Sequence, residues 1–317
     1  MRADWVAATV RARSMAQRRV GAGTCRELSA LPDLPAAVEA LEGSVYADQL
    51  AGTRTLGAAQ QATRRTVLWQ LRVLAGWLPA GQDTQLVRAA AARYEADNIV
   101  ALAAALRRNT GTGAGLEPGA DSAPVFDLGG LATAWPRLQT ADSPETLQAM
   151  LAASPWGDPG PAVSLPDMLT AVWLRRLASA APATRPWAVA GAVLLAARLL
   201  LVTGTGTTDR LVSLLRPLIG TRWTEAASLP ELTAALSPAA GQVLGEVQEP
   251  QELWRAEARL AAQVETDGFG LLRAGLPGPD VIVGAMAVLA ADAWRVRAAL
   301  AAAAAGTGRS EVLDAVA

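Results

Sequence analysis

Long helix-forming stretches separated by clusters of Gly and Pro are the feature that most limits the fold of this chain. Ala, Leu, Arg, Glu and Gln, which favour helices, dominate these stretches. Sustained alternation of apolar and polar residues, the pattern of a half-buried strand, is nearly absent. The breakers gather at 111–119, 155–161, 204–208 and 276–279. The sequence therefore predicts an all-α fold with both short and long helices.

Three stretches are candidates for long helices: 85–108, 187–202 and 280–304. The first and the last carry an apolar stripe at helical spacing, and each stripe is interrupted by one carboxylate, Glu95 or Asp292. The middle stretch has 16 residues, is apolar on all sides and contains Arg198. A membrane span needs about 20 apolar residues. We therefore expect a buried core helix there, with a membrane span as the alternative.

Two residue types are missing from the chain. It has no His, and all 28 basic side chains are Arg. Without His and Lys there is no histidine-based nucleophile or zinc site and no phosphate loop of the Walker type. The Gly-rich segments at 111–115 and 204–206 follow no strand and precede no Lys, so we interpret them as connections. We expect no catalysis, no cofactor, no metal and no direct nucleotide binding.

Charge and cysteine content exclude further classes. The net charge of −1 argues against a nucleic-acid partner, because such binding needs a basic excess. Cys25 is the single cysteine, so the chain can form no internal disulfide, and this fits a reducing compartment.

A short motif is repeated along the chain. The segment Asp33–Asp48 can be laid on Ser143–Asp158, so that Tyr46 matches Trp156 and a leucine matches a leucine five residues earlier. A weaker third copy is Ser228–Leu236. Because each copy is associated with one long helix, the repeat predicts three related helical units in a pseudo-threefold arrangement. We place unit 1 at 1–110, a linker at 111–125, unit 2 at 126–204 and unit 3 at 205–317.

The order of motifs resembles a known family. Val6–Met15, Cys25–Leu28 and Leu34–Tyr46 look like the start of the C subunit of archaeal and bacterial A/V-type ATP synthases, known as the d subunit in vacuolar ATPases. Long helices of that family carry an acidic-x-x-Asn-Leu-x-x-hydrophobic-Leu-Arg pattern. The segment Tyr94–Arg107 is similar to this pattern, and Asp292–Arg297 matches it in part. The resemblance covers essentially the whole chain in order.

The sequence also departs from the family pattern. The middle long helix has Ala188 and Gly191 where the acid and the Asn are expected, and Arg295 replaces the Asn of the last unit. The Lys-rich and Glu-rich surface of the family is missing as well. We therefore interpret the chain as a divergent member.

The resemblance implies a funnel-like, non-catalytic rotor component of a V/A-type ATPase. Such a component lies peripherally on the cytoplasmic face of the cell membrane and couples the proteolipid ring to the central stalk subunits, for proton or sodium transport. The alternative is an all-helical scaffold or interaction protein unrelated to the rotary ATPase. An enzyme with an unrecognised carboxylate–arginine site is a third class, made least favourable by the missing His and Lys.

Four polar residues are the candidates for a structural or interface role: Glu95, Asn98, Asp292 and Arg295. Each pair is three residues apart on one helix, so its members are neighbours on the helix surface. A carboxylate in an apolar stripe must find a partner, because burying it alone is costly. The partner is either another protein of an assembly or the interior of the same chain, and we favour the interior.

Arginine doublets occur at 18–19, 64–65, 107–108 and 175–176. Such doublets near helix ends usually remain solvated or interact with helix dipoles. The alternative is contact with acidic lipid headgroups or with an acidic rotor surface.

Overall fold

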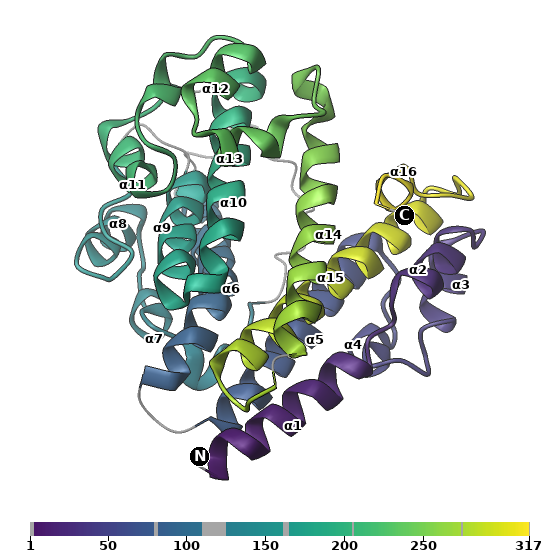
Figure 1. Ribbon diagram of the computed structural model, residues 1–317. Coiled ribbons are helices and arrows are strands. Elements are labelled where there is room, and N and C mark those ends of the chain that lie inside the picture. Colours follow the sequence, from purple (N-terminus) through teal and green to yellow (C-terminus); the bar gives the residue numbers. More distant parts are fainter. Residues whose placement is uncertain are drawn as a thin grey trace. The chain divides into compact units, whose positions relative to one another are not determined.

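The computed structural model describes residues 3–78, 82–109, 125–160, 165–204, 206–273 and 275–316. Within these ranges every regular element is a helix and there is no strand, which confirms the all-α prediction (Figure 1). The longer helices are α1 (Ala3–Gln17), α5 (Leu56–Trp77), α6 (Gln82–Asn109), α9 (Leu165–Ala180), α10 (Arg185–Ala197), α14 (Leu253–Leu272) and α15 (Pro279–Ala304).

Shorter helices lie between the long ones. They are α2 (Ala22–Ser29), α3 (Leu34–Glu39), α4 (Ala47–Leu50), α7 (Trp135–Leu138), α8 (Pro144–Ala152), α11 (Asp209–Ile219), α12 (Leu229–Ala235), α13 (Pro238–Gly241) and α16 (Glu311–Asp314). The starts of α3 and α8 are set by side-chain caps, because Asp33 and Ser143 accept the backbone N–H of the residue three positions later. A proline in the first turn of each helix reinforces these starts.

The chain divides into two compact units. The first consists of 1–84 together with 254–317, and the second of 85–253. The three consecutive units and the pseudo-threefold arrangement expected from the sequence stay a prediction. All but the last residue of the predicted linker 111–125 lies outside the described residues.

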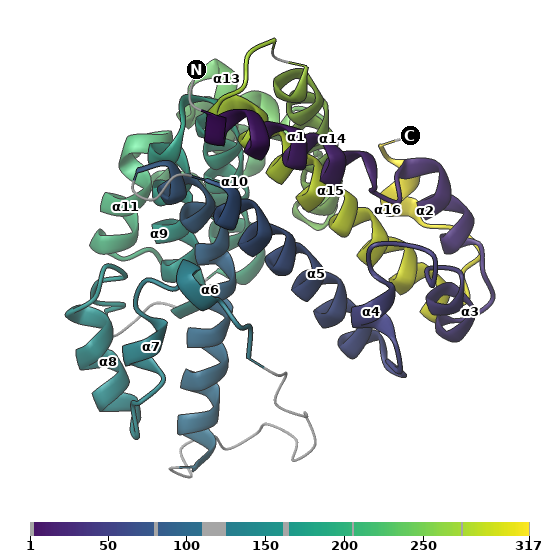
Figure 2. The ribbon, with the colours of Figure 1, turned by 90° about the horizontal axis from the view of Figure 1, so that it is seen from below.

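The first unit is built around α15. Ile282, Leu289 and Val296 of the predicted stripe are fully buried, and α1, α2 and α5 all pack on this helix (Figure 2). Helix α14 approaches α15 so closely that a Cβ at Gly284 would lie 2.6 Å from the carbonyl oxygen of Gly268. Because α15 is close to the C-terminus and its partners are close to the N-terminus, this unit is discontinuous in sequence.

The second unit is organised by α6, α9 and α10. Its core combines the apolar face of α6, where Ile99 is fully buried, with Leu138, Leu151 and Trp156 from the segments around α7 and α8. Helix α10 packs on α9 and α11 (Figure 1). The hydrophobic face of α6 thus carries the short helices that contain the second copy of the repeat.

The apolar stretch around α10 passes a length and composition test for a membrane span. An 18-residue window within Pro182–Thr203 has a mean hydropathy of 1.8, and half of that window is buried inside the structure. Its last turn is a π-helix, Arg198–Thr203. Ala188, Val193 and Ala196 of α10 are fully buried, so part of this stretch packs inside the second unit. The core helix expected from the sequence stays a prediction.

Candidate functional site

Glu95 is the acceptor for an entire helix start. It is 1 % exposed. Its Oε1 atom accepts the backbone N–H groups of Thr133 (2.9 Å), Ala134 (2.7 Å) and Trp135 (2.7 Å). Its Oε2 atom accepts the Thr133 hydroxyl and the indole N–H of Trp156 (3.2 Å). A residue on α6 therefore caps the N-terminus of α7, where amide groups would otherwise lack acceptors.

Asn98, one turn further along α6, holds the same segment at its other end. Its Nδ2 atom donates to the carbonyl oxygen of Phe126 (2.9 Å), and its Oδ1 atom accepts the Phe126 N–H (2.8 Å). The Asn98 amide thus makes with the Phe126 backbone the two hydrogen bonds that a neighbouring backbone segment would otherwise make. Glu95 and Asn98 are brought together, as the sequence predicts, and both bind within their own unit.

The segment held by these two residues lines a shallow cavity of about 400 Å³. The cavity is lined by Val125, Phe126, Asp127, Leu128, Gly129, Ala132, Trp135, Pro136 and Gln139. Among the described lining residues Asp127 is the single charged one, and most of the others are apolar. Such a surface provides packing for an apolar group.

Asp292 repeats this arrangement in the first unit. It is fully buried. Its Oδ1 atom accepts the N–H of Gly21 (2.8 Å), and its Oδ2 atom accepts the N–H of Val20 (3.2 Å) and the hydroxyl of Tyr46 (2.8 Å). Helix α2 begins at Ala22, so a carboxylate on α15 caps its start. Gly21 adopts φ +85°, a left-handed conformation that favours glycine.

The two aromatic donors lie in turns of the same construction. Ser44 and Ser154 each donate their hydroxyl to the carbonyl oxygen of the leucine three residues earlier, at 2.7 Å in both copies. Each serine oxygen also accepts the N–H of the aromatic residue two positions later, Tyr46 or Trp156, at 3.1 Å in both. The matched residues of the first two copies therefore share one local structure and one function, which is to place an aromatic donor on a buried carboxylate.

The third copy of the repeat has neither the aromatic donor nor the acid on the long helix. Ser228 caps α12 as its counterparts cap α3 and α8. The position that corresponds to Tyr46 and Trp156 by distance from the cap is Gly241, and the acid position on α10 is Ala188. Both residues are buried. A buried carboxylate without its donors is costly. We therefore expect the aromatic donor and the acid to be absent together, as they are in this copy.

Arg295 belongs to a different contact from its neighbour Asp292. Its Nη1 atom lies 2.6 Å from Oε2 of Glu265 on α14, and the two side chains are 5 % and 14 % exposed. Sequence reasoning missed Glu265, because it lies on a helix that also carries exposed charges. The available signal was Arg295 itself, since a buried guanidinium in an apolar stripe requires an acid on the facing helix.

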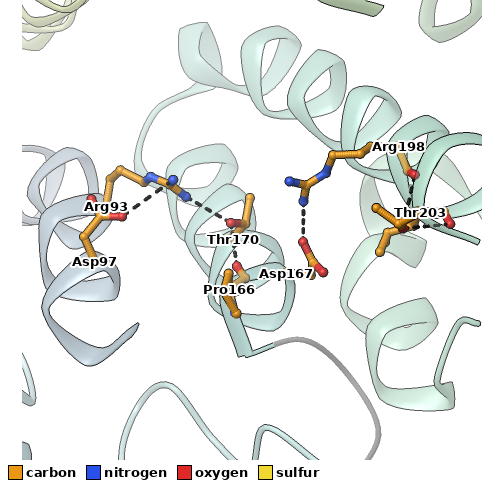
Figure 3. A network of polar contacts seen from close by, with 8 residues as sticks. Arg93, Asp97, Pro166, Asp167, Thr170, Arg198 and Thr203 are labelled. Carbon is orange, nitrogen blue, oxygen red and sulfur yellow. Dashed lines mark hydrogen bonds and ion pairs between the residues drawn. The ribbon is translucent and has the colours of Figure 1, made fainter. Parts of the chain in front are cut away.

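A second polar network joins α6, α9 and the π-helical turn (Figure 3). Arg93 donates to the Thr170 hydroxyl (2.9 Å) and lies 3.6 Å from the Asp97 carboxylate. Arg198, the charge inside the apolar stretch, is ion-paired with Asp167 in the first turn of α9. Figure 3 shows Arg93 and Arg198 reaching α9 from two sides.

Tyr46→Phe tests the hydrogen bond to Asp292. The change removes one donor to a buried carboxylate and leaves the two backbone donors in place. We expect the free energy of unfolding to fall by about 1.5–3 kcal/mol, measured by urea denaturation. In an Asp292→Asn background the same change should have a smaller effect. Equal effects in both backgrounds would show that the hydroxyl acts independently of Asp292.

Cys25 gives a prediction about pH. Burial raises the pKa of its thiol to about 12, and the nearby Asp292 carboxylate adds to this effect. The folded state thus retains a proton that the unfolded chain loses near its ordinary pKa of about 9. The contribution of the thiol to the free energy of unfolding is fully present below the unfolded-state pKa. It falls by about 1.4 kcal/mol per pH unit as the pH rises from that pKa toward the folded-state pKa. Urea denaturation between pH 8 and pH 10 should show a steeper loss for the wild type than for Cys25→Ala. Parallel pH profiles would contradict the assignment.

Within the described part of the chain, no three His, Cys, Asp or Glu side chains converge as metal ligands would. The Glu95 and Asp292 carboxylates are occupied by internal donors, so what they do chemically is to fix short helices onto long ones. No family model matches this sequence, and no curated protein matches it either.

Proposed function

We propose that this chain is a non-catalytic rotor component of a V/A-type ATPase. In this role it couples the proteolipid ring of the membrane sector to the central stalk subunits, for transport of protons or sodium ions. It lies peripherally on the cytoplasmic face of the cell membrane, and its three related helical units surround a pseudo-threefold axis in a funnel-like arrangement.

The observation that carries the proposal is the repeated anchor between an acidic helix and an aromatic turn. The family pattern of an acid followed three residues later by Asn falls on α6, where Glu95 and Asn98 hold the same segment. The partial match on α15 provides the second acid, Asp292, which holds the equivalent aromatic turn. The polar residues of the resemblance are therefore the ones that connect short helices to long helices.

This construction suits a mechanical part. Buried hydrogen bonds hold both ends of the short segment on the long helix and resist its displacement. They are charge-assisted at the Glu95 end and neutral at the Asn98 end. Close packing of α14 against α15 at Gly268 and Gly284 leaves no room for the two helices to approach further. Load applied to the short helices is thereby transmitted to the long helices.

Co-purification tests the proposal. An affinity-tagged chain, expressed in the cells that encode it, should isolate proteolipid-ring and central-stalk components from detergent-solubilised membranes. A tagged, unrelated all-helical protein of similar size is the control. Inside-out vesicles from cells lacking the chain should lose ATP-driven ion pumping, while ATP hydrolysis by the released catalytic sector continues.

Two results would overturn the proposal. One is a stable, soluble chain that isolates no ring or stalk component under conditions in which the assembled ATPase survives. The other is undiminished ATP-driven pumping in vesicles that lack the chain. The first result with normal folding would favour the alternative, a helical scaffold with unrelated partners.

A further inference from the structure

The two arginines of the doublet at 175–176 lie in different environments. Arg175 is exposed on α9. Arg176 is half-buried, and its guanidinium carbon lies 4.0 Å from the centre of the Trp156 ring. A guanidinium this close to the centre of an indole ring makes a cation–π contact, which restricts where the group can lie. The positive charge of Arg176 is therefore held beside the Trp156 ring.

A second arginine reaches the same turn from α11. Arg210 donates from Nη2 to the carbonyl oxygen of Trp156 (3.3 Å). Its guanidinium occupies the space beside Gly157, because a Cβ there would lie 2.2 Å from the Nη2 atom. Gly157 also has φ +73°, which disfavours any other residue. The turn at Trp156 and Gly157 thus brings together guanidinium groups from two helices that pack on each other.

Within the part of the chain that the structure describes, these two arginines have buried N–H groups that no hydrogen-bond acceptor reaches. The atoms are Nη1 and Nη2 of Arg176 and Nε of Arg210. One turn before Arg176, the indole N–H of Trp173 is also buried without an acceptor. Unpaired buried donors are rare in folded proteins, and charged donors are the most costly to leave unpaired. Among the described residues, the buried N–H groups at this turn therefore lack a hydrogen-bond acceptor.

The nearby carboxylates do not provide this acceptor. Glu95 already accepts three backbone N–H groups, a hydroxyl and the Trp156 indole. Asp158, next to Gly157, is exposed and accepts the N–H of Gly160 (2.8 Å). Burial lowers the pKa of Arg176, and the charge of Glu95 opposes this shift only in part. The carboxylate whose charge acts on Arg176 is therefore already occupied by other donors.

We propose that Arg176 and Arg210 form a binding site for a phosphoryl group. A phosphate oxyanion matches the fork of N–H groups on each arginine, and it supplies both the missing acceptors and the missing negative charge. Its source is either free inorganic phosphate or the phosphate of an anionic lipid headgroup. The proposal does not depend on the rotor function, because it rests on unpaired donors within the second unit.

The first arm of the test uses inorganic phosphate and the full chain. Isothermal titration, at constant ionic strength maintained with chloride, should show saturable binding to the wild type. Arg176→Gln and Arg210→Gln should each weaken binding roughly tenfold or more, because each removes charge-assisted hydrogen bonds. Arg175→Gln is the matched control, since it removes the adjacent exposed charge and should leave the affinity unchanged.

The second arm uses vesicles. Sedimentation with vesicles of phosphatidic acid in phosphatidylcholine, compared with phosphatidylcholine alone, tests the lipid source with the same variants. Binding to these vesicles without binding of free phosphate assigns the site to a headgroup, provided that Arg176→Gln abolishes it. If a Gln variant fails to fold, co-crystallisation of the wild type with tungstate locates the anion by its scattering.

Three outcomes would overturn the proposal. One is the absence of saturable binding in both arms with the wild-type chain. Another is equal affinity in wild type, Arg176→Gln and Arg210→Gln. The last is tungstate located away from the turn at Trp156 and Gly157. The first of these outcomes would assign the missing acceptors to buried water molecules.

Discussion

Glu95→Ala should lower the free energy of unfolding by about 3–5 kcal/mol, the largest effect expected in the second unit. Several donors lose their acceptor at once, among them the buried N–H of Ala134 and the buried indole of Trp156. The carboxylate also neutralises the amide end of α7, and this stabilisation is lost with it. Urea denaturation followed by circular dichroism gives the change directly.

The matched control for this prediction is Asp97→Ala. Asp97 lies on the same helix, but its side chain is 24 % exposed and its ion pair with Arg93 is long, at 3.6 Å. Its loss should change stability by about 1 kcal/mol or less. An unchanged melting temperature for Glu95→Ala, combined with loss of assembly with partner proteins, would instead place Glu95 in an interface. That result would contradict the internal role found for its carboxylate.

The second large effect is expected for Glu265→Ala. Arg295 is 5 % exposed, so removal of its partner leaves a buried positive charge uncompensated. We expect a loss of about 3–5 kcal/mol in the free energy of unfolding, again by urea denaturation. Asp267→Ala, two residues along α14, is the control, because Asp267 bonds the exposed Gln263 and its loss should be small.

A double variant separates the charge from the packing. Glu265→Leu with Arg295→Met replaces the ion pair by apolar groups of similar volume, and it should recover most of the stability lost in Glu265→Ala. Such recovery shows that the single variant suffers from an unpaired charge. A double variant as unstable as Glu265→Ala would show instead that the pair itself is required for packing of α14 on α15.

Several features follow from local sequence alone. Helix-forming composition and the absence of period-two patterns predict the all-α class, because these preferences act within a few residues. Asp33 and Ser143 predict helix starts for the same reason, since a cap bonds to an amide only three residues away. The placement of Glu95 and Asp292 in apolar stripes likewise indicates that both acids are buried with a partner.

Local sequence did not predict which residues donate hydrogen bonds to these two acids. Asp292 accepts from residues 20, 21 and 46, which are separated from it by more than 240 positions. The repeat aligned Tyr46 with Trp156, yet nothing in the alignment indicates that each donates to a carboxylate on a long helix. Such pairings depend on which helices pack together, and a single sequence carries no direct record of that choice.

The sequence by itself determined that this protein is helical, where its capped short helices begin, and which acids need a hydrogen-bonding partner, because these properties depend on the helical period and on desolvation of individual groups. Only the tertiary structure decided that α15 completes the core of the N-terminal helices, that Glu265 rather than a neighbour of Asp292 pairs with Arg295, and that two arginines share the turn at Trp156. The reason is that these contacts join residues distant along the chain, and they are selected by the packing of whole helices.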